Sequence, residues 1–452
     1  MEALITASVR AHLSCYEFAQ PALVGDDDGS SITLSTDTAH ASEDDGYQVK
    51  SKNAHGPASE IGQQARGSVS GSLRDILFSS WLNILLIFVP IGFMCPVAGM
   101  GSSTIFAANA VAIVPLSALL TNATERVAAH AGDAVGALLN ISLGNLVELI
   151  LFVALAHGHV RMVEASILGS VLVNLLLILG SALLVGSTVN SEPTYNTARA
   201  QLLACLLFVS MFTFLMPTAF ESTFHDDSPG PSASLQMSRI SSLVILAIYV
   251  VYLAHEIQLP SRHGEHIAYL RESHLDRDLD AQDTQASLAP RKEVIASIFM
   301  LILASVLMSV NAELLVGTID DVTSQTKLSE SVIGIIVLPI IGNIAEYSTV
   351  VSVAARDKLD LAIAVAVGSS IQIALCVTPL TVIAGWILHQ DLALTFSFFE
   401  MATLLGAVLL VNLLVLHGSS SSFRTGGLKG ALMCACYLII GLGAYCAPQS
   451  VV

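Results

Sequence analysis

Residues 144–174 read GNLVELILFVALAHGHVRMVEASILGSVLVN, and residues 342–373 read GNIAEYSTVVSVAARDKLDLAIAVAVGSSIQI. Both segments open with Gly-Asn-x-x-Glu inside an apolar helix. Both reach Gly-Ser on the next helix, 25 residues after the first Gly in one segment and 26 in the other. A match of this length indicates an internal repeat. Each copy places an acidic side chain within an apolar segment.

The composition around the repeat is that of a membrane protein. The chain has 452 residues, of which 54% are hydrophobic and only 12% charged, against about 25% charged in a typical soluble domain, and its mean hydropathy is +0.71. Apolar side chains can face outward in lipid, where backbone polar groups are satisfied within helices. The sequence therefore predicts an all-α polytopic membrane protein. The bilayer is its expected partner, and no nucleic-acid partner is expected.

Eleven apolar segments are long enough to be membrane spans, which need about 20 mostly apolar residues. We predict them at residues 76–96, 104–121, 134–156, 163–187, 200–220, 240–259, 293–317, 331–354, 360–386, 392–416 and 429–447. With the N-terminus in the cytosol, the cytosolic loops hold eleven Lys and Arg residues and the opposite loops three. The positive-inside rule favours this orientation, which places the C-terminus on the far side of the membrane.

These spans define the expected domain organisation. Residues 1–70 hold ten acids and four Lys/Arg without a sustained apolar period, which predicts a disordered cytosolic tail. The longest internal loop, 260–292, is polar and is expected to be a cytosolic linker. The remaining parts are a first transmembrane helix (76–96), a first five-helix repeat (104–259) and a second five-helix repeat (293–447). Two tandem units with an odd number of spans must lie in opposite orientations, which is typical of secondary transporters with a central site.

The repeated acids are the candidate site residues. A carboxylate at membrane depth costs at least about 2.5–3.5 kcal/mol, so Glu148 and Glu346 are expected to have a partner or a transport role. Asn145 and Asn343 each precede the acid by three residues and share its helix face. A single Glu of this kind is often a hydrogen-bonded structural residue. Two copies at matching places favour a shared functional site.

Further oxygen ligands are expected from the neighbouring helices. Ser170, Ser369 and Gln372 follow the repeated Gly in the two copies, although Ser on membrane helices often serves only packing. The assembled site would be rich in oxygen and carry up to two negative charges. This suits a hard divalent cation such as Ca²⁺, which takes about 6–8 oxygen ligands. No His/Cys cluster points to zinc or copper. No cofactor is expected.

The chain resembles the cation/proton exchanger family, specifically the fungal-type vacuolar Ca²⁺/H⁺ antiporters. The resemblance covers about residues 72–447. It is carried by TNATERVAAHAG (121–132), GNLVELI (144–150), EASILGSVLVNLLLILG (164–180), LVGTID (315–320), GNIAEYS (342–348), DKLDLAIAVAVGSSIQIAL (357–375) and FSFFEMATLL (396–405). It implies eleven helices, with the first outside the two repeats. It also implies that Glu148 and Glu346 alternately carry Ca²⁺ or protons, in the membrane of a vacuole or similar acidic organelle.

The sequence departs from the family pattern at three places. Tyr347 follows Glu346 where the family commonly has His, a difference that bears on proton handling and ion preference. Val173 stands where a Ser is common, and the 260–292 linker is less acidic than is typical. Glu400 lies in an apolar segment without a counterpart in the other repeat, so it could be structural or part of a proton route.

The expected function is therefore exchange of cytosolic Ca²⁺ for lumenal protons, without enzymatic activity. Mn²⁺ is a possible second substrate because it also favours oxygen ligands. Na⁺-coupled Ca²⁺ exchange is the alternative, but Leu146, Val147, Ile344 and Ala345 offer no Na⁺ ligands beside the acids. An intramembrane hydrolase would need a paired-Asp or Ser/His constellation, and a receptor or scaffold would not need duplicated buried acids. The oligomeric state is not determined by the sequence.

Overall fold

The computed structural model describes residues 81–131, 146–189, 197–224, 233–258, 289–326, 328–416 and 424–447. All of them belong to one compact unit, residues 57–452. Every regular element in these ranges is a helix. The predicted tail (1–70) and the predicted linker (260–292) lie outside the described residues.

Eight described helices are long and apolar enough to cross a membrane, and two shorter apolar helices accompany them, at Leu82–Val97 and Phe398–Leu413. The predicted span 134–156 is described only from residue 146 onward. The chain is therefore an all-helical membrane protein, and the number of eleven spans stays a prediction.

The first half of the chain begins with a short helix pair that precedes the first repeat. Its elements are η1 (Trp81–Ile87), α4 (Phe88–Val97), α5 (Ser102–His130), η2 (Leu146–Glu148), α7 (Leu149–Ala156), α8 (Val160–Leu172), η3 (Val173–Ile178), α9 (Leu179–Val189), α10 (Thr197–Ser210), α11 (Phe212–Thr223) and α12 (Ala233–Gln258). Helix α5 extends well beyond the predicted 104–121. Arg126 continues the helix past the apolar run because its Nε donates to Asn122 Oδ1, one turn earlier, at 2.9 Å.

The second half follows a similar order. Its elements are α14 (Ala289–Val316), α15 (Ile319–Gln325), α16 (Glu330–Val332), η4 (Ile333–Val337), α17 (Leu338–Ala355), α18 (Leu359–Gln372), η5 (Ile373–Val377), α19 (Thr378–Ile387), α20 (Phe398–Leu416) and α21 (Arg424–Cys446). Helix α20 begins at Phe398 and not at the predicted 392. Ser397 and Glu400 form a reciprocal cap at this end, with Ser397 N–H donating to Glu400 Oε2 at 2.7 Å and Glu400 N–H donating to Ser397 Oγ at 3.3 Å.

The two halves match in the helices that follow the repeated Gly-Asn-x-x-Glu motif. In each half the helix that carries Gly-Ser widens into a π-helical turn and then continues as an α-helix, as α8–η3–α9 in one half and α18–η5–α19 in the other. Turns of this kind occur frequently at functional sites. The repeat predicted from the sequence is therefore present in the local backbone conformation as well.

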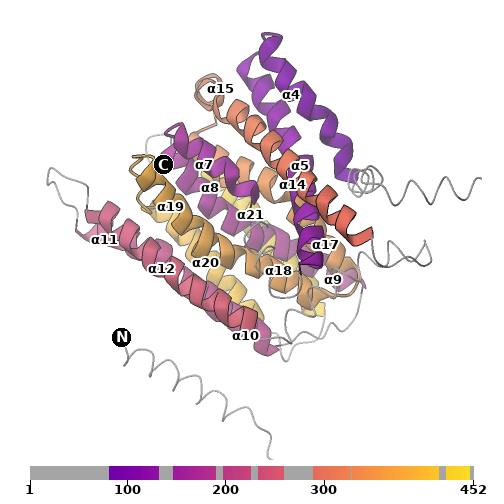
Figure 1. The fold of residues 1–452 in the computed structure, drawn as a ribbon. Coiled ribbons are helices and arrows are strands. Elements are labelled where there is room, and N and C mark those ends of the chain that lie inside the picture. The colour runs from indigo at the N-terminus through magenta and orange to yellow at the C-terminus, as the bar shows by residue number, and fades with distance from the viewer. Residues whose placement is uncertain are drawn as a thin grey trace, which may run out of the picture. The chain divides into compact units, whose positions relative to one another are not determined.

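The halves pack against each other through long helices and close backbone approaches. Helices α5 and α14, which open the two repeats, lie against each other in the structure (Figure 1). A Cβ on Gly169 of α8 would collide with the backbone carbonyl of Ile335 in η4, and one on Gly334 would lie 2.7 Å from the Cβ of Ala165. Small residues at such contacts let membrane helices approach closely.

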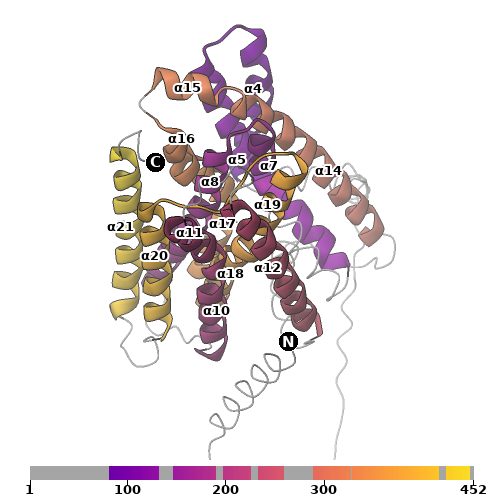
Figure 2. The ribbon, with the colours of Figure 1, turned by 90° about the vertical axis from the view of Figure 1, so that its left-hand side faces the viewer.

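Many large apolar side chains remain exposed on the outer helices. Ile302 on α14 is 60% exposed and Leu438 on α21 is 69% exposed, and α12 exposes Val251 to a similar degree. Helices α20 and α21 stand side by side at one edge of the described bundle, with α12 and α14 on other sides (Figure 2). Apolar surface of this extent is typical of contact with lipid.

Candidate functional site

Glu148 lies where a 3₁₀ turn becomes helix α7. It is the last residue of η2 and immediately precedes the first residue of α7. Its carboxylate is partly buried, and the buried Ser170 on α8 lies near enough for its hydroxyl to stabilise the negative charge. The structure thus places the predicted residue Ser170 beside Glu148.

Glu346 occupies the corresponding place in the second half. It lies on α17, and the hydroxyl of Ser369 on α18 donates a hydrogen bond to Glu346 Oε1. The side-chain amide of Asn174 also lies near this carboxylate and stabilises its negative charge. Each repeated Glu is thus held by the Ser that follows the repeated Gly on the next helix, which is the same arrangement in both halves.

Two asparagines join the halves at this point. The amide of Asn174, in the π turn η3 of the first half, lies 3.3 Å from Oδ1 of Asn343 on α17 of the second half. Asn343 is anchored in turn, because its amide donates to the carbonyl of Pro339 at 2.9 Å. The charges of Glu148 and Glu346 also act on each other, by repulsion. These contacts bring residues of the two repeats close together.

Of the two remaining predicted ligands, Gln372 and Asn145, only Gln372 lies within the described residues. Gln372 is the last residue of α18 and is partly buried, within the same segment as Ser369. Asn145 lies outside the described residues. Asn174 was not predicted, although the sequence carries a signal for it: an amide in the apolar run VLVNLLLILG (171–180) is costly in a membrane unless it has partners.

The site can bind a cation or accept protons with the same atoms. It brings together carboxylate, hydroxyl and amide oxygens, which are the ligands that Ca²⁺ prefers. Two carboxylates that repel each other are stabilised by a cation between them or by protonation. Because the same oxygens serve both purposes, binding of the cation and of protons should be mutually exclusive.

Glu400 belongs to a separate cluster of charges. It is fully buried in the first turn of α20, and its Oε2 lies 3.6 Å from Nη2 of Arg161. Nη1 of Arg161 donates to Oε2 of Glu164 at 2.7 Å and to the carbonyl of Thr395 at 3.3 Å. Glu400 thus has an Arg partner, which favours the structural one of the two roles considered for it. Glu164, three residues after Arg161, was not identified from the sequence.

Comparison with known proteins identifies the family of the chain. The family model described as "Sodium/calcium exchanger protein" matches residues 102–258 and 296–445. The chain is 36% identical over 384 residues to the "Vacuolar calcium ion transporter" of Schizosaccharomyces pombe, covering 84% of this chain and 89% of that protein. It is 35% identical over 377 residues to the "Ca(2+)/H(+) antiporter" of Synechocystis sp., covering 81% of this chain and 98% of that protein.

A solved structure shares the fold. The crystal structure of the selenium-substituted Ca²⁺/H⁺ antiporter protein YfkE superimposes with a TM-score of 0.65 and 28% sequence identity, covering 81% of this chain and 99% of that chain. The family model matches both halves, and each half contains one of the repeated acids. The protein is therefore a member of the sodium/calcium exchanger protein family.

Proposed function

We propose that this protein is a secondary active antiporter that exchanges cytosolic Ca²⁺ for protons from the lumen of an acidic organelle. It is a transporter and not an enzyme, as its family and relatives are ion exchangers and transporters. The observation that carries the proposal is the pair of membrane-embedded carboxylates, Glu148 and Glu346. Each lies beside a repeat-related serine, and their charges act on each other.

The pairing supplies a coupling mechanism. With both acids deprotonated, the site offers two negative charges to one Ca²⁺. With protons bound, it is neutral and has no charge to attract the ion. An empty, doubly charged site would be costly to move through the protein interior. The site therefore changes its access from one side of the membrane to the other only when Ca²⁺ or protons are bound. Transport of Ca²⁺ in one direction then requires transport of protons in the other.

Two observations support protons over Na⁺ as the counter-ion. Leu146 and Val147 before the first acid, and Ile344 and Ala345 before the second, offer no side-chain oxygens for Na⁺. The relatives named above are also called a Ca²⁺/H⁺ antiporter or a vacuolar calcium ion transporter. Mn²⁺ is proposed as a second substrate because it favours oxygen ligands as well.

The relatives' names also bear on location. We place the protein in the vacuolar membrane or another acidic-organelle membrane, as a multi-pass protein, since relatives from fungi and plants carry the word vacuolar. The excess of Lys and Arg on one set of loops supports a cytosolic N-terminus, a cytosolic 260–292 linker and a lumenal C-terminus.

Ca²⁺ uptake by sealed, acid-loaded vesicles tests the function. Uptake should require an inside-acid gradient and should stop when an ionophore collapses it, because lumenal protons drive the entry of Ca²⁺. An outward Na⁺ gradient at equal pH on both sides should not replace it. Protease added outside should cleave within 260–292, which controls for the orientation. Uptake driven by Na⁺ alone, or unaffected by loss of the proton gradient, would contradict the proposal.

Replacing Asn174 tests the residue that joins the two halves. In Asn174→Ala we expect the Ca²⁺ concentration for half-maximal uptake to rise about tenfold, since the substitution removes the hydrogen bond to Asn343 and one hydrogen bond contributes about 0.5–1.5 kcal/mol. Asn412→Ala is the matched control. Asn412 donates to a carbonyl one turn earlier, Val408 O at 2.9 Å, as Asn174 donates to Ser170 O at 3.2 Å, but it lies on α20. If the two substitutions have equal effects on Ca²⁺ uptake, Asn174 does not contribute to the transport site.

A further inference from the structure

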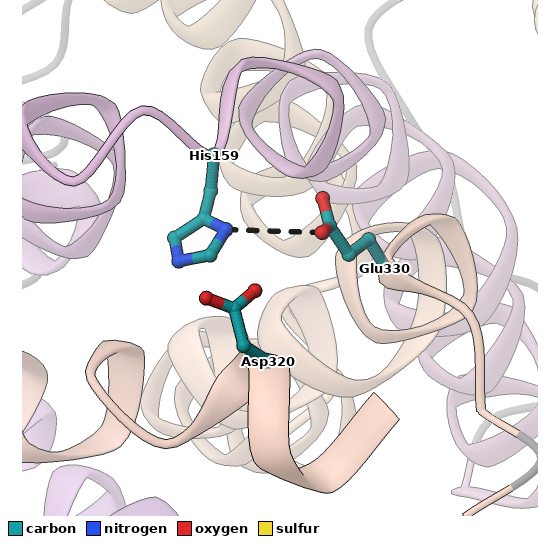
Figure 3. Close-up of side chains that lie close together, drawn as sticks. All are labelled: His159, Asp320 and Glu330. Atoms are coloured by element: carbon teal, nitrogen blue, oxygen red, sulfur yellow. Dashed lines mark ion pairs between the residues drawn. The ribbon is translucent and has the colours of Figure 1, made fainter. Parts of the chain in front are cut away.

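Three potential metal ligands converge away from the transport site, at the turn between α7 and α8. They are His159, which immediately precedes α8, Asp320 in the first turn of α15, and Glu330, the first residue of α16. One ligand atom from each lies within 4.8 Å of the others. Figure 3 shows the three side chains directed toward one another from three separate segments of the chain.

The imidazole of His159 is directed into this cluster without a hydrogen bond to it. Its side chain is only 10% exposed, and its Nδ1 lies 3.9 Å from Oε1 of Glu330. That separation is too long for a hydrogen bond. The largely buried imidazole and the two carboxylates leave room for a cation between them, and small side-chain rotations would bring the three ligand atoms to bonding distance.

The charges of the cluster also favour a cation. Asp320 and Glu330 place two like charges near each other, which is unfavourable unless a positive group lies between them. A divalent ion would neutralise both carboxylates and use the imidazole nitrogen as a third ligand.

We propose that His159, Asp320 and Glu330 form a binding site for a first-row divalent transition ion of the Zn²⁺ class, separate from the transport site. One imidazole and two carboxylates match the ligands of Zn²⁺, with a water completing a tetrahedral set. Ca²⁺ and Mg²⁺ prefer sites made entirely of oxygen. The ion would tie the start of α8 in the first repeat to α15 and α16 in the second. In the proposed orientation this end of the bundle faces the lumen.

A second His–carboxylate pair nearby provides a matched control. Nε2 of His157 lies 3.2 Å from Oε1 of Glu313, which is near enough for a direct ion pair without a metal. His157 is two residues from His159 on the same turn, yet it is not part of the three-ligand cluster. Loss of His157 should therefore leave the binding of Zn²⁺ intact.

The test measures Zn²⁺ affinity of the full-length, tag-free protein in detergent by titration calorimetry, with thermal stabilisation as a second readout. Glu346→Gln is used as the background, because it removes a transport-site acid and shares no residue with this cluster. We expect His159→Ala and Asp320→Asn each to weaken Zn²⁺ binding at least about tenfold, since even residues that only support a metal ligand alter affinity by about 10–100-fold. His157→Ala should bind as the background does, and Ca²⁺ should not compete.

Asp320→Asn covers the case in which His159→Ala fails to fold, because Asp320 is exposed. Three outcomes would refute the proposed Zn²⁺ site. They are absence of Zn²⁺ binding in the Glu346→Gln background, unchanged binding in both His159→Ala and Asp320→Asn, and equal weakening of binding in His157→Ala. Each of these outcomes is independent of Ca²⁺ uptake, so failure here is distinguishable from failure of the proposed transport function.

Discussion

Replacing Glu148 or Glu346 by Gln is expected to abolish proton-coupled Ca²⁺ uptake while leaving the protein folded and inserted. Gln preserves the shape of the side chain but removes the charge that attracts Ca²⁺ and the group that carries the proton. One unit charge at about 4 Å from another contributes on the order of 4 kcal/mol at an effective dielectric constant of 20. About 1.4 kcal/mol corresponds to tenfold. We therefore expect each single substitution to lower initial uptake rates at least about 100-fold.

Glu400→Gln is the matched control for this loss. It removes another buried carboxylate, but one that lies beside Arg161 and not beside the repeated acids. It leaves the ion pair of Arg161 and Glu164, so the effect on uptake should be mild. Insertion and folding are checked by size-exclusion profiles of the purified variants. A well-folded Glu148→Gln or Glu346→Gln protein that still accumulates Ca²⁺ at a near-normal rate would refute the shared site.

Arg161→Met is expected to destabilise the fold strongly without touching the transport site. Arg161 lies between two buried carboxylates, Glu164 at 2.7 Å and Glu400 at 3.6 Å. Removing one partner of a buried ionic cluster leaves uncompensated charge and typically costs about 3–5 kcal/mol. Since the Arg161 side chain is 41% exposed, we expect the lower end, about 3 kcal/mol. The thermal midpoint of the detergent-purified protein measures the change.

Two further variants test the reason for that loss. In the double variant Arg161→Met/Glu164→Gln one of the two stranded charges is gone, so about half of the lost stability should return. Arg239→Met serves as the control for an arginine whose acidic partner is exposed. Arg239 Nη2 lies 3.5 Å from Asp391, whose side chain is 83% exposed, and ion pairs of exposed groups contribute about 0–1 kcal/mol. The Arg239 side chain is itself 18% exposed and its guanidinium lies 5.4 Å from the centre of the Trp386 ring, which adds about 0.5–1 kcal/mol. A midpoint that falls equally in Arg239→Met and Arg161→Met would show that burial of the cluster is unimportant.

Much of the site could be predicted because its signals are local. The pairing of Glu148 with Ser170 and of Glu346 with Ser369 follows from one spacing that occurs twice in the chain. A carboxylate in an apolar segment is costly wherever that segment packs, so it marks a functional position without knowledge of the packing. Asn343 was predicted from another local signal, its position one helical turn before Glu346.

Other features, in the transport site and in the Arg161 cluster, depend on contacts between distant residues. Asn174 and Asn343 are 169 residues apart, and Arg161 and Thr395 are 234 apart. No spacing within either segment specifies such a meeting. Glu400 looked like an isolated acid within a span, yet the structure gives it a cap at Ser397 and an Arg from another helix. The predicted start of this span, residue 392, was wrong for a local reason: residues 392–397 are apolar enough to be helix but precede the cap formed by Ser397 and Glu400.

The sequence alone determined the membrane class, the two-fold repeat and the repeated acids, because composition and spacing are properties of the chain before it folds. Tertiary structure decided which neutral side chains reach those acids and which charged side chains neutralise one another. It also decided that His159, Asp320 and Glu330 meet at one end of the bundle. These contacts arise when helices of the two halves pack at close range through residues such as Gly169 and Gly334, so their partners are chosen by the packing and not by local pattern.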